Sequence, residues 1–148
     1  MELSQDLPEL IYLDNAATVF PKPREVLDEM VEVYSRYGVT PGRSGYDLCL
    51  IGGELVQTTR AELAGFFGGS KPERLSFAYN ASDALNILIQ GLAGAGDHVV
   101  STTVEHNSVI RPLNHLKRDV GVEVDYVPFE TGGHVDPERI AAAFRNNT

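Results

Sequence analysis

The second half of the sequence alternates short apolar segments with amphipathic ones, and this alternation constrains the fold more than any other feature. The expected elements are strands at 75–79, 98–102 and 122–127, and helices at 82–92, at about 108–119 and from Asp136 and Pro137 onward. Strands that alternate with helices form βαβ units, in which consecutive strands lie parallel. We therefore predict an α/β fold with a mostly parallel sheet.

The first half of the sequence is expected to be helical. Apolar residues recur at helical spacing over 21–37 and again from about Tyr46 to Phe67. The Gly- and Pro-rich segment 38–45 joins the two stretches as a loop. Three parallel strands are few for a sheet that needs cover on both faces. The sequence therefore predicts two N-terminal helices followed by an incomplete α/β domain.

Composition excludes several classes of partner and site. The 148 residues hold 12 Lys plus Arg against 21 Asp plus Glu, a formal net charge of −9, so we expect neither a nucleic acid nor an anionic membrane as partner. Cys49 is the only cysteine and no two histidines are spaced i, i+4, so no metal site is expected. The opening MELSQDLPEL lacks the features of an export signal, and no apolar run is long enough for a membrane span. We expect a cytoplasmic protein.

Polar residues follow two of the predicted strands, at carboxyl ends that share one edge of a parallel sheet. After 75–79, a helix beginning near Ser82 and Asp83 would offer backbone N–H groups and a hydroxyl to a phosphate, although an inward-facing Asp83 would repel it. After 98–102, His106 would enter the same crevice as an acid/base or as a stacking ring. Helix-capping residues and an exposed loop histidine explain the same pattern, so the residues alone leave both interpretations open.

Five motifs carry a family resemblance. They are YLDNAAT at 12–18, PGRSG at 41–45, SFAYNASDALN at 76–86, GDHVVST at 96–102 and VEHNSVIRPL at 104–113. Their order and spacing resemble the N-terminal part of the cysteine desulfurase and selenocysteine lyase family, pyridoxal-phosphate enzymes of the class V aminotransferase group. The resemblance implies part of a fold-type-I large domain over 21–148. It also implies an N-terminal arm over 1–20 that contributes to the small domain and the active site.

The resemblance also implies roles for individual residues. Ala81 and Ser82 match the turn that binds the cofactor phosphate, and His106 matches the histidine that stacks on the pyridine ring and assists proton transfer. Asn15 and Ala16 match a segment near the substrate carboxylate, and Arg43 matches a loop near the active site and dimer contact.

Three positions at the phosphate turn depart from the family pattern. Members usually have Gly, Thr and Glu where this sequence has Asn80, Ser82 and Asp83. Ser82 keeps the hydroxyl, and we expect Asn80 to tolerate a left-handed turn.

The resemblance implies an enzyme, a lyase that takes sulfur or selenium from a cysteine-type amino acid and leaves alanine, and that is a homodimer when complete. Its chemistry needs a lysine for the Schiff base. Lys22, Lys71 and Lys117 do not match that lysine, so we expect the chain alone to be inactive. Two alternatives stay open. One is another enzyme of the group, an aminotransferase or epimerase. The other is a non-enzymatic α/β module that binds a small phosphate ligand or a partner chain.

Overall fold

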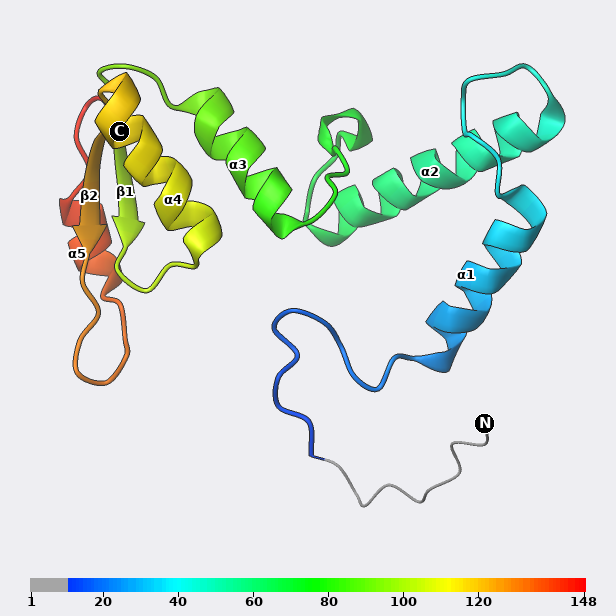
Figure 1. Cartoon of the computed structure of the whole chain (residues 1–148), viewed down its shortest axis with the longest axis horizontal. Helices are drawn as coiled ribbons and strands as arrows, with labels where there is room; N and C mark the ends of the chain where they lie inside the picture. The colour runs from blue at the N-terminus through cyan, green and yellow to red at the C-terminus, as the bar shows by residue number, and fades with distance from the viewer. Residues whose placement is uncertain (1–10) are drawn as a thin grey trace. The chain divides into compact units, whose positions relative to one another are not determined.

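The computed structural model describes residues 11–148, and the chain divides into two compact units, Met1–Leu75 and Ser76–Thr148. The prediction about MELSQDLPEL, and the first half of the predicted arm over 1–20, lie outside the described residues. The family resemblance predicts another division, between an N-terminal arm over 1–20 and the large domain over 21–148. That division rests on function and not on compactness, and it stays a prediction. Each unit is described by itself below (Figure 1).

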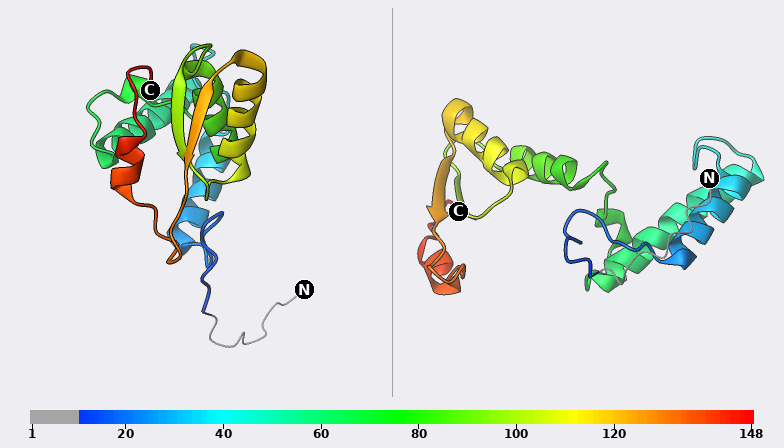
Figure 2. Two further views of the ribbon diagram at one scale, coloured as in Figure 1. Left: turned by 90° about the vertical axis from the view of Figure 1, so that its left-hand side faces the viewer. Right: turned by 60° about the horizontal axis from the view of Figure 1, so that its bottom comes forward.

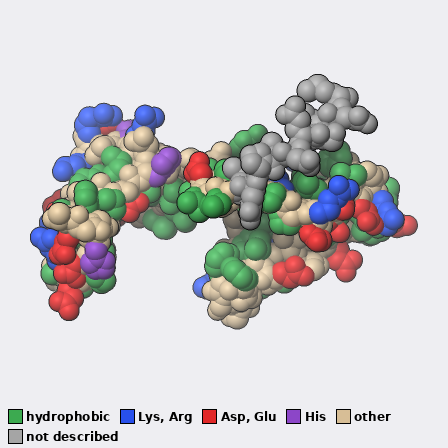
Figure 3. Space-filling view, turned by 90° about the horizontal axis from the view of Figure 1, so that it is seen from below, with side chains coloured by type: hydrophobic (Ala, Val, Ile, Leu, Met, Phe, Trp, Pro, Cys, Tyr) green, Lys and Arg blue, Asp and Glu red, His purple; other side chains and the backbone are tan. Residues whose placement is uncertain are grey.

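The first unit is helical, as predicted. It contains α1 (Arg24–Tyr37) and α2 (Asp47–Phe66), followed by a 3₁₀ turn, η1 (Pro72–Arg74). None of the residues of α1 is buried, and hydrophobic side chains lie open on the surface in Figure 3. The exposed hydrophobic residues of α1 include Val26, Met30, Val31 and Tyr34. Much of the apolar stripe of α1 is therefore exposed, while Val33 and Tyr37 are half-buried.

Cys49, near the start of α2, holds the loop that joins the two helices. Its Sγ lies 2.8 Å from the Thr40 carbonyl oxygen, to which it donates, and accepts the Ser44 amide at 3.2 Å. The Gly42 amide also donates to the Cys49 carbonyl oxygen, at 3.4 Å. The side chain is 1% exposed. Cys49 is thus a buried structural residue of the loop.

The second unit is a βαβ arrangement with additional helices. Its elements are α3 (Ala81–Leu92), β1 (His98–Thr102), α4 (Asn107–His115), a turn of π-helix η2 (Leu116–Val120), β2 (Glu123–Val127) and α5 (Pro137–Ala142). The two strands are parallel, in a register that runs from His98 opposite Glu123 to Thr102 opposite Val127. The predicted parallel βαβ unit is confirmed. At the start of α5, the Asp136 carboxylate accepts the Glu138 amide at 2.9 Å, as expected for an N-cap.

The prediction of a strand over 75–79 is wrong for this structure. Within residues 11–148 the sheet has two strands, β1 and β2, and segment 75–79 belongs to neither. Phe77 and Tyr79 are 52% and 94% exposed. A strand is defined by its ladder of hydrogen bonds with a neighbour, and an apolar run without such a neighbour stays irregular.

Helices α3 and α4 pack on one face of the sheet and form the core of the second unit with it (Figure 2). The centre of the core consists of Leu113, Leu116, Val122 and Val124, with Ile89, Ala93, Val99, Val109 and Tyr126 packed against it. Val124 and Tyr126 point to the same face because successive side chains of a strand alternate between faces. The packing of α3 against α4 in this core positions the first turns of both helices.

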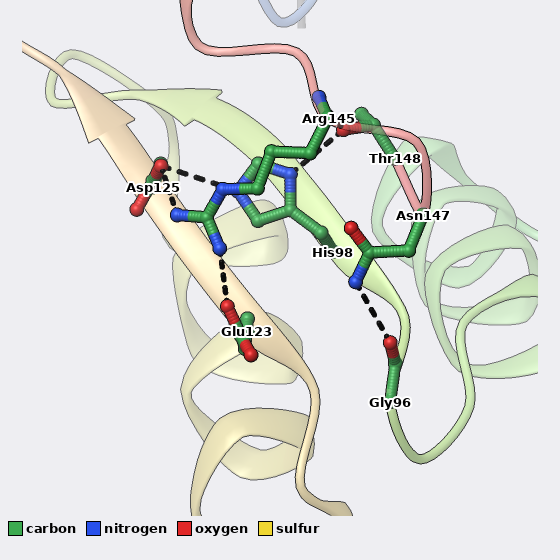
Figure 4. Close-up of polar contacts among 7 residues, drawn as sticks. All are labelled: Gly96, His98, Glu123, Asp125, Arg145, Asn147 and Thr148. Carbon is green, nitrogen blue, oxygen red and sulfur yellow. Dashed lines mark hydrogen bonds and ion pairs between the residues drawn. The ribbon is translucent and has the colours of Figure 1, made fainter.

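The other face of the sheet carries polar side chains that hold the C-terminal segment (Figure 4). Arg145 pairs with Glu123 and, at 2.7 Å, with Asp125. His98 is 3% exposed, with its Nδ1 2.8 Å from Thr148 Oγ1 and its Nε2 3.2 Å from Asp125 Oδ2. The hydrogen bond from Arg145 is the largest cause that lowers the pKa of Asp125. In the described part of the chain, no helix is long and apolar enough to span a membrane.

Candidate functional site

A polar pocket of about 440 Å³ lies alongside α3 and α4 in the second unit and reaches from their first turns to Gln90 and His115. Its lining is Ser82, Asn86, Gln90, His106, Asn107, Ser108, Arg111, Pro112 and His115. The structure thus brings Ser82 and His106 to one pocket, with Ala81 beside Ser82 at the start of α3.

The first turn of α3 keeps two amide groups available for a ligand. The first N–H groups of any helix have no carbonyl within the helix to bond. The Asn80 side chain accepts the Asp83 amide at 2.9 Å, which leaves the amides of Ala81 and Ser82 ahead of it. Asn80 has extended backbone, with φ −164° and ψ 176°, so its tolerance of a left-handed turn is not used here. Asn80 instead acts through its side chain, as an N-cap.

Asp83 does not line the pocket. Its carboxylate turns back from the first turn and accepts the Tyr79 amide at 3.1 Å. Together with the Asn80 cap this contact resembles a capping box, except that Asp83 accepts the amide of Tyr79, the residue before the N-cap, and not that of Asn80. The carboxylate that would repel a phosphate is therefore engaged by the backbone that precedes α3.

His106 is the N-cap of α4, and its contacts define its tautomer. The Ser108 amide donates to His106 Nδ1 at 3.2 Å, and Ser108 Oγ lies 2.9 Å from the same nitrogen. A backbone N–H is always a donor, so Nδ1 is unprotonated. The proton of the neutral ring is consequently on Nε2.

Asn86 connects the two first turns. Its Nδ2 donates to the Ser82 carbonyl oxygen at 2.8 Å and to the Ser108 carbonyl oxygen at 3.4 Å. Its Oδ1 accepts from Gln90 Nε2 at 3.0 Å, which orients the amide group. One side chain therefore contacts both the helix that carries Ser82 and the helix capped by His106.

Pro112 is buried and lies inside α4, as its sixth residue. A proline in that position has no N–H for the carbonyl four residues earlier, which is that of Ser108.

The nine lining residues include arginine and histidine but no carboxylate. Arg111 brings a permanent positive charge. Nδ1 of His115 lies 2.7 Å from Asp119 Oδ2, and the hydrogen bond from Arg118 lowers the pKa of that carboxyl more than any other contact does. Hydroxyl, amide and guanidinium donors without an acid suit an anionic ligand. Among residues 11–148, no group of three or more His, Cys, Asp or Glu is placed to hold a metal ion.

The remaining candidates belong to the first unit. Asn15 ties its own segment together, because its Nδ2 donates to the Tyr12 carbonyl oxygen at 3.2 Å and its Oδ1 accepts the Phe20 amide at 3.0 Å. Ala16 lies in an exposed bend of that segment, and Arg43 is exposed in the loop held by Cys49.

Lys117, the one lysine of the second unit, lies in η2, beyond the end of α4. A helical rise of 1.5 Å per residue puts its backbone about 16 Å from that of His106. Lys22 donates to Thr18 Oγ1 at 2.7 Å and to the Val19 carbonyl oxygen at 3.0 Å, within its own segment.

Sequence reasoning gave no role to Asn86, Ser108 or Arg111, although all three lie within the motifs. Ser82, Asn86 and Gln90 are spaced i, i+4, i+8, which is a polar stripe on one helix face. Pro112 stands four residues after Ser108 and signals a carbonyl without a helical donor. Those two spacings could have indicated the connection between the helices.

Comparison with known proteins places this geometry in context. Residues 11–148 match the family described as Aminotransferase class-V. The chain is 38% identical over 151 residues to a probable cysteine desulfurase of Methanothermobacter thermautotrophicus, covering 99% of this chain and 37% of the relative. It is 33% identical over 159 residues to a selenocysteine lyase of Xenopus tropicalis, covering 96% and 36%. The chain thus spans little more than a third of these relatives.

Among solved structures, the apo cysteine desulfurase of Thermococcus onnurineus NA1 has a similar fold. The TM-score is 0.76 at 27% sequence identity, with 88% of this chain and 33% of the other covered.

Proposed function

We propose, from the premise that this chain belongs to the class-V aminotransferase family, that it forms the N-terminal part of a pyridoxal-phosphate-dependent cysteine desulfurase or selenocysteine lyase. The observation that carries the proposal is the pocket shared by Ser82 and His106, the residues that match the family's phosphate turn and ring-stacking histidine. The similarity to cysteine desulfurases and to a selenocysteine lyase supports the choice of reaction within the family.

The pocket fits the phosphate and the ring of such a cofactor. The amides of Ala81 and Ser82, the Ser82 hydroxyl and the Arg111 guanidinium offer donors to a dianion at the positive end of α3. His106 supplies a flat ring whose Nε2 carries a proton it can donate. Bound pyridoxal phosphate would supply an electron sink for the amino acid's α-carbon. Ala81, Ser82 and Arg111 would hold the phosphate, and His106 would stack on the ring and move a proton.

The proposed reaction removes sulfur from cysteine. The Cβ–S bond breaks, the sulfur passes to an acceptor thiol as a persulfide, and Cβ gains a proton to give alanine. Selenocysteine would lose selenium in the same way. Cys49 is not that acceptor, because its thiol is buried and donates to the Thr40 carbonyl oxygen.

The remaining residues expected at the site, and the expected assembly, belong to the same proposal. Asn15 and Ala16 would lie near the substrate carboxylate, and Arg43 would lie in a loop near the active site and the dimer contact. The complete enzyme is a cytoplasmic homodimer. The chain alone is inactive, because none of Lys22, Lys71 and Lys117 matches the lysine that the chemistry requires.

Cofactor binding by the 148-residue chain tests this proposal. We expect Ser82→Ala to weaken the affinity for pyridoxal phosphate about tenfold, since hydrogen bonds to charged groups contribute about 1.5–3 kcal/mol. Its affinity for pyridoxal, which has no phosphate, should change less than twofold. Ser35→Ala, on exposed α1, is the matched control. Equal losses for both ligands, or none for either, would contradict the assignment.

His106 is tested by two replacements. His106→Phe keeps a flat ring and should retain more affinity for pyridoxal phosphate than His106→Ala does. His134→Ala, in an exposed turn of the same unit, is the control. If the chain binds inorganic phosphate as tightly as pyridoxal phosphate, the phosphate-binding module replaces the enzyme as the better interpretation.

A further inference from the structure

We propose that Asn86 is a positioning residue that joins the phosphate turn to His106 by supplying the hydrogen bond that Pro112 removes from α4. The inference rests on the proposed function and adds a residue to the machinery of the same site. It concerns the contact of the Asn86 side chain with the Ser108 carbonyl oxygen.

The hydrogen bonding of α4 is interrupted at Ser108. In an α-helix each carbonyl accepts the amide four residues later. Ser108 stands four residues before Pro112, which has no N–H, so this carbonyl lacks its regular donor. Pro112 is buried, and Ser108 is half-buried on the side of the pocket. A buried carbonyl without a donor destabilises the fold, so a substitute donor there has a measurable effect.

The substitute donor is Asn86, which belongs to α3, the other helix of the site. Asn86 Nδ2 lies 3.4 Å from the Ser108 carbonyl oxygen and 2.8 Å from that of Ser82. An amide nitrogen has two protons, one for each carbonyl. The Ser82 carbonyl can also accept the backbone amide of Asn86 within α3, whereas the residue four positions after Ser108 is Pro112, which has no amide hydrogen to donate. The contact with the Ser108 carbonyl is therefore the one whose loss should destabilise the site most.

Ser108 links the Asn86 side chain to His106. The Ser108 amide donates to His106 Nδ1 and selects the tautomer with the proton on Nε2. Asn86 fixes the same residue through its carbonyl, and Gln90 fixes Asn86 by donating to Oδ1 at 3.0 Å. The chain of contacts Gln90, Asn86, Ser108 and His106 thus holds the imidazole at a set place relative to Ser82. Without Asn86, the first turn of α4 frays and the capping bond to Nδ1 forms less often.

A double-mutant cycle between Asn86→Ala and Pro112→Ala tests the contact in the full 148-residue chain. Pro112→Ala restores the missing N–H and so replaces the donor function of Asn86. We expect Asn86→Ala to raise the unfolding equilibrium constant about tenfold in the parent and no more than about twofold in the Pro112→Ala background. Asn114 lies in α4, and its Oδ1 accepts the Tyr126 hydroxyl. Asn114→Ala removes this unrelated contact and should have the same effect in both backgrounds. Equal effects of Asn86→Ala in both backgrounds would overturn the inference.

Two further readouts separate positioning from simple stabilisation. The ¹⁵N chemical shifts of the His106 ring should show one tautomer in the parent, a mixture in Asn86→Ala, and one tautomer again in the double variant. The Kd for pyridoxal phosphate should rise about tenfold in Asn86→Ala and recover in the double variant, as loss of one hydrogen bond near a charged ligand predicts. An unchanged ring spectrum and an unchanged Kd would reduce Asn86 to a structural residue.

The outcomes distinguish this inference from the proposed function. A parent chain that fails to bind pyridoxal phosphate overturns the proposed function, while the cycle and the ring spectrum still decide whether Asn86 positions His106. If Asn86→Ala does not fold, the double variant is expected to fold, because α4 then supplies its own donor. A double variant that also fails to fold would overturn the inference.

Discussion

Replacement of Cys49 by alanine should loosen the loop that carries Arg43. The substitution removes a thiol that is 1% exposed, donates to the Thr40 carbonyl oxygen at 2.8 Å and accepts the Ser44 amide at 3.2 Å. Each lost hydrogen bond costs about 1 kcal/mol, and both backbone partners lie in exposed loop where water can replace the thiol. With the small void left by the sulfur, we expect the free energy of unfolding to fall by about 2 kcal/mol.

Urea unfolding followed by circular dichroism measures that change, and hydrogen exchange at the Ser44 amide reports the loop directly. Cys49→Ser, whose hydroxyl can make both contacts, is the matched variant and should lose less than Cys49→Ala. The Arg43 side chain would remain, but the backbone that carries it would be less well ordered. A change below about 0.5 kcal/mol in Cys49→Ala, with unaltered exchange at Ser44, would refute the reasoning.

Three further predictions concern the second unit and the lysines. Because the hydrogen bond from Arg145 lowers the pKa of Asp125 below its ordinary 3.8, the stabilising contribution of Asp125 is present above that pH and lost as the pH falls through the lowered value. The stability difference between the parent and Asp125→Asn in urea titrations should therefore be larger at about pH 5 than below about pH 3; a difference that persists at the lower pH would contradict the pairing. Gly121 ends η2 at φ +86° with open space around it, so Gly121→Ala should cost about 1 kcal/mol of conformational strain in thermal unfolding, and Gly132→Ala, also in open space but without a positive φ, much less. Borohydride reduction of the chain with pyridoxal phosphate should leave no specific pyridoxyl adduct in peptide mass spectra, and saturating modification of one lysine would show that the chain carries its own reactive lysine; the candidates are Lys22, Lys71 and Lys117.

Local sequence patterns predicted most of the elements, because helix periodicity and capping depend on near neighbours. The apolar spacing over 82–92 predicts α3 within one residue of its start, and Asp136 before Pro137 predicts the start of α5. The alternation of strand and helix likewise predicts the parallel pairing of β1 with β2. Sequence reasoning also placed Ser82 and His106 in one crevice, and both line one pocket, although the strand expected before Ser82 at 75–79 does not form.

Tertiary structure decided what depends on a partner elsewhere in the chain. Segment 75–79 has the residues of a strand, yet a strand exists only where another backbone completes its ladder. The direction of the Asp83 carboxylate follows from the position of the Tyr79 amide, which no periodicity specifies. The contact of Asn86 with Ser108 forms because the core packs α3 against α4. The sequence by itself thus determined which segments are helices and which residues cap them. Only the packed structure determined which side chains meet, since contacts between distant residues depend on the three-dimensional arrangement of the elements.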